Sequence, residues 1–436
     1  SAGNRKTWTF SAWVKRTEIT ATSNATGNQN MVFSAGDTYL QFDGNAIWIN
    51  HRAASENFFL ATNRLFRDSS AWYHIVWQLD TTDSTAADRA KLYINGVRET
   101  SFQNSTYDNM SLNYEAAVNN TVEHEIGKYS LHDTTYAGMF NGYMAEIHLV
   151  DGTALTPTSF GEFDSDSGIW KPKAYTGSHG TNGFYLDFSD SANLGDDASG
   201  NGNNFTETNI TSADQATDTP TNNFCTMNML DRTNGNSKNQ EGATKVTTDG
   251  GSGWCSMVAT MGVTKGKWYW ETQRSGGSSD SNDVVTGIVG SEDAYIPYSS
   301  AAQYYIGNVA TSSSMGFYTT GVPNVRNGDG GSLSNSAGDI IMIGLDMDNS
   351  KIYFGVNGTW DALGTGGSSL HADFDGEFVL PAVAVYQGKQ IKINFGGYAS
   401  YTISSAASDA DGYGTFEYAP PSGYYALCTK NLEEYG

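Results

Sequence analysis

Several residue types that would narrow the chemistry of a protein are rare in this chain of 436 residues. Its three cysteines, Cys225, Cys255 and Cys428, show neither a metal-ligand spacing nor a disulfide framework, so we expect apolar cores to stabilise it. The apolar runs are too short to span a bilayer, and we therefore expect no insertion into a membrane. Helical leucine periodicity is nearly missing, which argues against a helical fold.

Positively charged residues are also scarce, because 24 Lys and Arg stand against 47 Asp and Glu. The formal net charge of −23 would repel the phosphates of a nucleic acid, and no basic stripe offsets it. We therefore expect no nucleic-acid partner. Since only 16% of the residues are charged, we interpret the acidic groups as a surface that keeps a β-rich protein soluble and blunts edge-to-edge strand pairing.

Sheet and turn residues are abundant, with 49 glycines and 13% aromatics against 8 prolines. Residues 72–97 and 339–358 share one pattern: an apolar strand ending in Asp, a turn, then Lys, alternating apolar residues around Tyr, and an Asn-Gly pair. This alternation predicts strands, and Asn-Gly is the preferred two-residue turn of a hairpin. The sequence therefore predicts an all-β chain of two jelly-roll or β-sandwich domains in tandem.

The first of these domains is expected in residues 1–163. Four segments of it resemble, in the same order, the landmarks of laminin-G-like, concanavalin-A-like lectin domains. They are Phe10–Val14, Trp72–Val76, Leu92–Gly96 and Phe140–Ile147. The resemblance covers most of the domain and implies a lectin-like β-sandwich.

The second domain is expected in residues 241–405, which resemble the SPRY domain, itself a twisted β-sandwich. The segments that carry this resemblance are Gly266–Glu271, Gly338–Asp346, Leu380–Val383 and Ile393–Gly396. We interpret residues 164–240 as an ordered connector rich in Gly, Asn and Asp, whose composition indicates turns. Residues 406–436 are expected to pack back as a final extended strand with a ragged end.

A catalytic interpretation would require two carboxylates on one strand face, as in glycoside hydrolases built on this sandwich. The chain has no Glu-x-Asp run of the required spacing, and Glu123 with Glu125 is its nearest pair. We interpret these two as solvated strand ends. No nucleophile elbow, His-Glu-x-x-His helix or phosphate loop occurs. We therefore predict that the protein is not an enzyme, with a polysaccharide depolymerase as a minor hypothesis.

The connector crowds oxygen-bearing side chains into one loop. Tight turns built from Asx side chains are the first interpretation of this loop. A Ca²⁺ site that staples the connector is the second, since Ca²⁺ binds oxygen ligands and some laminin-G-like domains use calcium. The candidate calcium ligands are Asp187, Asp190, Asp196, Asp197, Asn201 and Asn203.

Exposed aromatic residues are the other candidates for a binding site. A sugar ring stacks on a flat aromatic side chain, while amides and backbone groups hydrogen-bond its hydroxyls. Ordinary half-buried packing is the alternative interpretation of such residues. The candidate ligand-binding residues, which fall near expected loops or strand ends, are Trp48, Tyr304, Tyr305, Tyr318, Asn357 and Trp360.

The domain combination and the acidic, Asn- and Thr-rich character resemble fibre and decoration proteins of marine tailed bacteriophages. This resemblance implies a virion-surface, extracellular protein that recognises host surface glycans through the loops of its sandwiches, as a tail fibre, capsid fibre or capsid decoration. It also implies contacts with other virion proteins and a homo-oligomer, for which a trimer is one form.

A second interpretation keeps the fold and changes the role. The chain would then be a purely structural, self-associating virion subunit or a bacterial surface adhesin without sugar binding. Binding to glycans would favour recognition, whereas stable oligomers without any glycan binding would favour the structural role.

Overall fold

The computed structural model describes two compact units, Ser1–Gln215 (unit 1) and Ala216–Gly436 (unit 2). Both consist almost entirely of β-strands, which confirms the predicted all-β tandem of sandwiches. The described residues are 2–19, 29–52, 57–106, 110–130, 138–232, 237–248, 254–275, 284–290, 305–309, 337–360, 368–369, 378–386 and 388–436. Within them, no helix has the length and apolar character needed to cross a membrane.

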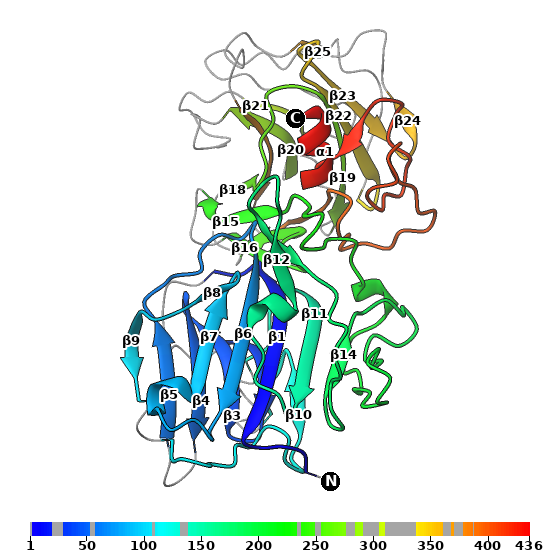
Figure 1. Ribbon diagram of the computed structural model, residues 1–436. Coiled ribbons are helices and arrows are strands. Elements are labelled where there is room, and N and C mark those ends of the chain that lie inside the picture. The colour runs from blue at the N-terminus through cyan, green and yellow to red at the C-terminus, as the bar shows by residue number, and fades with distance from the viewer. Residues whose placement is uncertain are drawn as a thin grey trace. The chain divides into compact units, whose positions relative to one another are not determined.

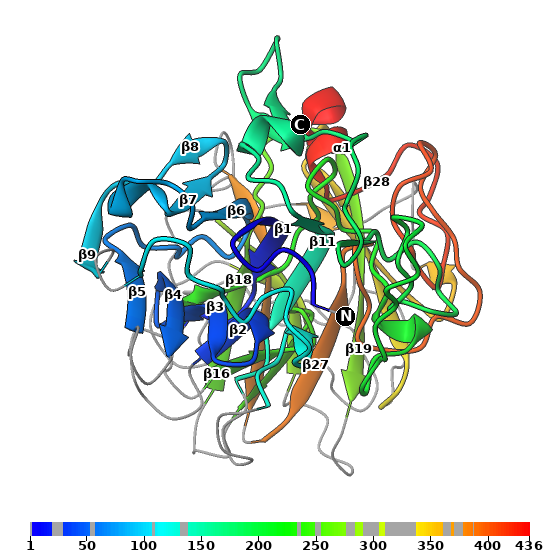
Figure 2. The same cartoon turned by 60° about the horizontal axis from the view of Figure 1, so that its bottom comes forward.

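Unit 1 contains two main antiparallel sheets (Figure 1). The first has the strand order β14 (Phe184–Leu186), β11 (Gly142–Asp151), β1 (Thr7–Arg16), β6 (Trp72–Asp80), β7 (Ala90–Ile94) and β8 (Val97–Arg98). The second has the order β10 (His124–Ile126), β2 (Gln29–Ala35), β3 (Thr38–Asp43), β4 (Ala46–Arg52), β5 (Asn57–Thr62) and β9 (Phe102–Ser105). Figure 2 shows strands of the two sheets as separate layers.

The core of unit 1 lies between these sheets because apolar residues alternate along their strands. On β1, Trp8 and Phe10 are fully buried, and Phe10 stacks on Phe33 of the facing sheet at 4.4 Å between ring centroids. Trp77 of β6 packs edge-on against Trp8 at 4.7 Å. The intervening residues of β1 and β6 point to the other face of the first sheet.

A third layer covers part of that outer face. It contains the 3-10 helix η3 (Pro157–Ser159) and a hairpin of β12 (Gly161–Phe163) and β13 (Trp170–Pro172), which pair with each other. Phe160 packs there with Val76 of β6 and Val150 of β11. The first sheet is therefore buried on both faces.

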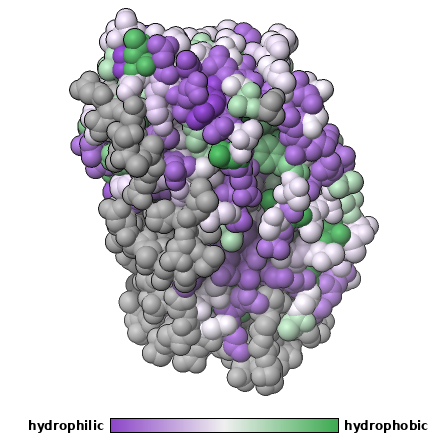
Figure 3. Space-filling view, turned by 90° about the horizontal axis from the view of Figure 1, so that it is seen from below, coloured by the Kyte–Doolittle hydropathy of each residue, from purple (hydrophilic) through white to green (hydrophobic). Residues whose placement is uncertain are grey.

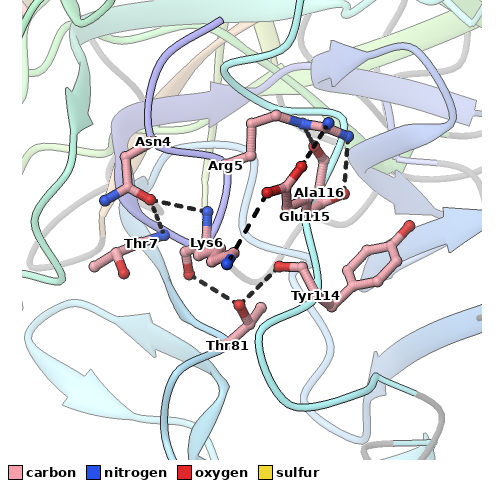
Figure 4. Close-up of polar contacts among 8 residues, drawn as sticks. All are labelled: Asn4, Arg5, Lys6, Thr7, Thr81, Tyr114, Glu115 and Ala116. Carbon is pink, nitrogen blue, oxygen red and sulfur yellow. Dashed lines mark hydrogen bonds and ion pairs between the residues drawn. The ribbon is translucent and has the colours of Figure 1, made fainter.

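The N-terminal segment is tied to the loop before β10 (Figure 4). Arg5 donates from Nε to the carbonyl of Ala116 at 2.7 Å and forms an ion pair with Glu115 at 3.1 Å. The hydroxyl of Thr81 donates to the carbonyl of Tyr114 at 2.7 Å. Two segments far apart in the sequence are thus held beside the end of β6.

Unit 2 also contains two main sheets. One has the order β15 (Met227–Arg232), β18 (Trp254–Ala259), β26 (Val379–Tyr386), β20 (Val284–Gly290) and β21 (Tyr305–Val309). The other has the order β16 (Ser237–Gln240), β17 (Lys245–Thr248), β27 (Gln390–Asn394), β19 (Lys267–Ser275), β22 (Ile340–Asp346), β23 (Lys351–Val356) and β24 (Thr359–Trp360). The short β25 (Ser368–Ser369) pairs with β23, and β28 (Tyr425–Ala426) runs parallel to β19.

The two predicted hairpins are present in the expected registers. In unit 1, β6 pairs with β7, and the Asn95-Gly96 turn leads into β8. In unit 2, β22 pairs with β23, and Asn357-Gly358 leads into β24. Both residues of each turn have positive φ, 48° and 81° in the first and 47° and 84° in the second. These angles suit an Asn-Gly pair in a tight hairpin turn.

The domain boundaries differ from those predicted. The expected connector 164–240 is divided between the units, since β14 joins the first sheet of unit 1 while β15 and β16 belong to unit 2. Phe184 and Leu186 explain this, because both are core residues of unit 1. The apolar run at residues 183–188 predicts a strand here, but it does not show which sheet that strand joins.

The C-terminal tail forms an outer layer on unit 2. It contributes β28, but it ends in the helix α1 (Thr429–Tyr435) where a ragged end was expected. Leu432 and Tyr435 of this helix pack against the core. Within the tail, Asp409 accepts hydrogen bonds from Ala426 N at 3.0 Å and Asn431 Nδ2 at 2.8 Å, which fold the tail on itself.

A buried carboxylate joins this tail to the sheet beneath it. Glu271 of β19 is fully buried and accepts hydrogen bonds from the hydroxyls of Tyr269 at 2.8 Å and Tyr401 at 2.7 Å. The backbone N–H groups of Glu417 and Tyr418 donate to it at 3.0 and 2.8 Å. Burial raises the pKa of Glu271, and these donors oppose that rise.

Replacing this carboxylate should destabilise unit 2. In Glu271→Gln one carboxylate oxygen becomes an NH₂ group, which cannot accept the hydrogen bonds that the tyrosine hydroxyls and backbone N–H groups donate. We therefore expect the free energy of unfolding to fall by about 3 kcal/mol. Chemical denaturation measures this change. The matched control is Glu241→Gln. The wild-type carboxylate of Glu241 is half exposed and lies 3.8 Å from Lys245, so its replacement should change the free energy of unfolding by no more than about 0.5 kcal/mol. Equal stability of the two variants would show that the carboxylate is not the anchor of the tail.

Candidate functional site

The structure brings two of the predicted ligand residues, Asn357 and Trp360, together at one end of unit 2. The turn is fixed by the Asn357 amide, whose Oδ1 accepts from Ile340 N at 2.9 Å and whose Nδ2 donates to Asp339 Oδ1 at 2.8 Å. Asn357 is exposed, but its polar atoms hold the hairpin in shape. Its observed role is to position the strand that carries Trp360.

Trp360 is half buried at the edge of an aromatic layer on the outer face of the large sheet. Its ring lies over Gly344 of β22, where an added Cβ would stand 3.4 Å from Cη2, and its centroid is 6.1 Å from that of Tyr269. A glycine beneath the ring lets it lie close against the sheet. The indole is therefore rigidly supported on one side and partly exposed on the other.

Tyr418 supplies a second half-buried ring at this place. It belongs to the tail and packs against the same aromatic layer as Trp360, while its ring lies over Gly358 at 3.0 Å from the position of an added Cβ. The backbone N–H of Tyr418 is held by Glu271 at 2.8 Å. Burial, and then the negative charges of Glu417, Glu271 and Asp339, raise the pKa of its hydroxyl, which stays protonated and able to donate.

Trp360, Tyr418 and the turn residues Asn357 to Thr359 thus form one surface, here named the Trp360 surface. Two aromatic rings lie beside exposed polar groups of the turn and the carboxylate of Asp339. This combination can stack on an apolar ring face and hydrogen-bond hydroxyls around it. Tyr418 could not be identified from the sequence, because nothing in the tail shows that it folds back beside β24.

Trp48 takes a different position, on β4 of unit 1. Ile47 and Ile49 beside it face the core, so Trp48 lies on the opposite face of its sheet. It is half buried and packs edge-on against Phe59 of β5 at 5.0 Å. Its indole nitrogen is buried and has no hydrogen-bond partner among the described residues. These contacts favour a packing role on the outer face.

The remaining aromatic candidates cannot be placed in a site. Tyr304 and Tyr318 lie outside the described residues. Tyr305 begins β21, where its backbone pairs with Val289. The binding roles of these three residues stay predictions.

The acidic loop of unit 1 is organised by hydrogen bonds within the protein. The carboxylate of Asp197 accepts from the backbone N–H groups of Tyr185 at 2.8 Å, Ser199 at 3.0 Å and Asn203 at 2.9 Å. Asn201 donates from Nδ2 to the carbonyls of Gly180 and Gly183, and Asn203 donates to the carbonyls of Thr181 and Gly183. These contacts pin the loop to β14.

The other three predicted calcium ligands also accept protein donors. Asp187 accepts from Ser189 N at 3.0 Å, Asp190 from Ala192 N at 2.9 Å, and Asp196 from Asn204 Nδ2 at 2.8 Å. The first two are Asx turns. In the part of the chain that the structure describes, no group of three or more His, Cys, Asp or Glu side chains is placed to hold a metal ion. The observed contacts therefore favour the turn interpretation of this loop.

The nearest carboxylate pair lines a small cavity at the edge of the second sheet of unit 1. Glu123 and Glu125 border a volume of about 240 Å³ together with Gly36, Val122 and Tyr129. Glu125 accepts from Ser130 N at 2.7 Å and lies 3.6 Å from Lys128 Nζ. Its oxygens are thus occupied by a local turn rather than directed at a substrate.

The coloured part of the face in Figure 3 is mainly hydrophilic, with hydrophobic residues in small separate groups. Small, separate apolar groups of this kind are ordinary on an exposed protein surface. An aromatic patch bordered by polar groups, like the Trp360 surface, fits this pattern.

Two family models match separate parts of the chain. Residues 2–159 match the concanavalin A-like lectin/glucanases superfamily, and residues 267–398 match the SPRY domain. A search of curated proteins finds no match.

Among solved structures, similar ones include the SPRY domain of human HERC1 (20% identity, 38% of this chain and 96% of that chain, TM-score 0.29). Another is the PSpry domain of TRIM65 (14% identity, 39% of this chain and 89% of that chain, TM-score 0.26). Domains of the two matched families are generally non-catalytic and bind other molecules. The chain therefore carries a concanavalin-A-like domain followed by a SPRY domain.

Proposed function

We propose that this protein recognises host surface glycans, without catalysis, as a virion-surface component of a tailed bacteriophage. The observation that carries the proposal is the Trp360 surface, where two supported aromatic rings border exposed polar groups. Glycan recognition uses this combination, since the rings stack on pyranose faces and polar groups select the hydroxyl pattern. The paired sandwiches supply a rigid scaffold for such a surface.

In this proposal the protein is extracellular and is part of a tail fibre, a capsid fibre or a capsid decoration. It contacts other virion proteins and self-associates, with a trimer as one form. Imaging of the native assembly, with antibodies against unit 2, tests this location. Labelling of the virion surface supports it, and labelling of host envelopes only would indicate a bacterial surface adhesin.

A structural, self-associating role is the second candidate. The hairpin β12–β13 of unit 1 exposes Phe163 and Ile169, whose exposed fractions are 57% and 67%. Exposed apolar residues on a projecting hairpin are typical of contacts with another chain. Stable oligomers that bind no glycan on a broad array would favour this role over recognition.

The proposed glycan surface makes a direct prediction for Trp360. Trp360→Ala should weaken binding to a glycan identified on an array by about tenfold, or about 1.4 kcal/mol, because the stacking ring is lost. Isothermal titration with the purified glycan measures this change. The matched control is Phe378→Ala, which removes another exposed aromatic of unit 2, with an exposed fraction of 56%, and should leave the affinity unchanged. Equal affinities of the wild type and Trp360→Ala would remove the Trp360 surface from the proposal.

Tyr418 allows a finer test of the same surface. Tyr418→Phe keeps the ring and removes the hydroxyl, so we expect a loss of about threefold to tenfold if the hydroxyl bonds the glycan. Tyr418→Ala should lose both contributions and bind more weakly than Tyr418→Phe. Thermal melting of each variant checks that unit 2 stays folded. Binding that is indifferent to both substitutions would limit the contact to Trp360.

A further inference from the structure

Residues 156–174, here named the strap, cover the outer face of the first sheet of unit 1. The strap contains η3 and the hairpin β12–β13, which projects from unit 1 in Figure 2. Phe160 packs on Val76 and Val150 of the sheet. Trp170 lies flat over Gly96, where an added Cβ would stand 2.6 Å from its ring.

The strap makes nearly all of its hydrogen bonds within itself. Gly161 to Phe163 pair with Trp170 to Pro172, Lys173 N donates to the carbonyl of Phe160, and Asp164 N donates to the carbonyl of Ile169. Its ion pairs, Lys171 with Asp164 and Lys173 with Glu162, are also internal. All of its residues are described, and one hydrogen bond links them to the rest of the chain: Trp170 Nε1 to His74 Nδ1, at 2.9 Å.

This bond determines the protonation of His74. An indole N–H only donates, so Nδ1 of His74 must carry a lone pair. The ring is therefore neutral with its hydrogen on Nε2, which faces Ser11 Oγ at 2.8 Å. A second proton on Nδ1 would place two donors face to face and would break the bond to the strap.

Among the residues that the structure describes, no acidic group contacts His74 to stabilise a positive charge on it. The side chain is fully buried, Trp13 of β1 stacks on it at 4.8 Å, and Trp170 of the strap lies at 5.9 Å. Burial lowers the pKa of His74 to about 3, with no charged group opposing the shift.

Other titratable groups lie on β1, β11, β14 and the segment after the strap. Lys15 of β1 is fully buried and lies on the same sheet face as Trp13, the residue opposite His74. His148 of β11 is buried, and its Nδ1 lies 3.1 Å from His179 Nε2. Glu146 Oε2 lies 3.9 Å from His148 Nε2 and accepts from the hydroxyl of Tyr185 at 2.7 Å. Burial, and then His179 and His74, lower the pKa of His148 to about 3.

His179 and Glu146 complete this set. Burial lowers the pKa of His179, and the negative charge of Asp197 partly offsets this shift. Burial raises the pKa of Glu146. A contact such as His148 with His179 requires at least one of the two rings to be neutral. The strap is thus closed over His74, which must stay neutral, and the adjoining segment over a histidine pair of which at least one member must stay neutral.

We propose that the strap is an acid-released latch, held to the sheet by the Trp170–His74 hydrogen bond and freed when His74 gains a proton. Release uncovers His74, Val76 and the ring of Trp170 while leaving the sandwich core intact. The core does not depend on the strap, because the strap contributes no strand to either main sheet.

The direction of the pH effect follows from the two states of His74. In the closed state its pKa is depressed, whereas in the open state the hydrated ring has its ordinary value of about 6.5. The closed state is therefore favoured fully above pH 6.5 and loses stability as pH falls toward 3. Between pH 6.5 and pH 5 the closed-to-open ratio should fall about 15-fold for His74 alone.

Hydrogen exchange of the full chain, corrected for intrinsic rates, tests the latch. We expect the protection of amides in 161–172 to fall about 25-fold from pH 7 to pH 5, while amides of β1 and β6 keep theirs. His74→Gln can still accept from Trp170 and does not titrate, so most of this fall should disappear. His124→Gln is the matched control, because it removes another histidine of unit 1, half buried on β10 and away from the strap, and should leave the fall unchanged.

Trp170→Phe covers the case in which His74→Gln does not fold. This variant keeps a ring over Gly96 but removes the indole N–H that donates to His74. The strap amides should therefore be less protected from hydrogen exchange than in the wild type at pH 7, and their protection should fall less when the pH is lowered to 5. The proposal is overturned if strap protection in the wild type is equal at both pH values, or if β1 and β6 lose protection in parallel. It is also overturned if His74→Gln or Trp170→Phe shows the full wild-type fall.

Discussion

The outer layer of unit 2 depends on one buried charge. Glu271 is fully buried and forms no ion pair with the residues that the structure describes, so hydrogen-bond donors compensate its negative charge. Two of these donors are tyrosine hydroxyls, and two are consecutive backbone N–H groups of the tail. A carboxylate in a medium of low polarity strongly favours such donors and makes their loss costly. The tail therefore has one position in which this charge is compensated, and this selects the path of residues 416–418 over the sheet.

Unit 1 meets the same constraint with different chemistry. In both units one sheet is covered on its outer face by the chain itself, so polar side chains on that face must find partners in the covering segment. Unit 2 uses a carboxylate with several donors, whereas unit 1 uses the imidazole of His74 with a single donor, Trp170. A carboxylate ringed by donors holds its layer through several bonds at once. A lone imidazole acceptor holds its layer through a bond that one proton removes.

The strands and hairpin turns could be predicted from the sequence, because the alternation of apolar and polar residues along the chain encodes them. The strand–turn–strand patterns around Asn95-Gly96 and Asn357-Gly358, and the order of the strands that resemble each family, led to both sandwiches. The tail was expected to pack back, but the contacts within both covering layers could not be predicted, because they join residues far apart in the chain, such as Trp170 with His74. For the same reason only Asn357 and Trp360 of the Trp360 surface were identified, and Tyr418 was missed. The acidic loop shows a third limit, since composition cannot tell whether carboxylates accept backbone N–H groups or bind a cation.

The covering layers also decide where a ligand can bind. A sheet face packed against its own chain is not available, and the recognition surface that we propose lies instead at the hairpin end Asn357–Trp360. Tyr418 links this end to the interior, because Glu271 fixes its backbone while its ring lies over Gly358. The ring is therefore positioned by a core interaction and not by the surface loop beside it. A surface built in this way presents its aromatic groups in a defined geometry before any ligand arrives, which lowers the entropy lost on binding.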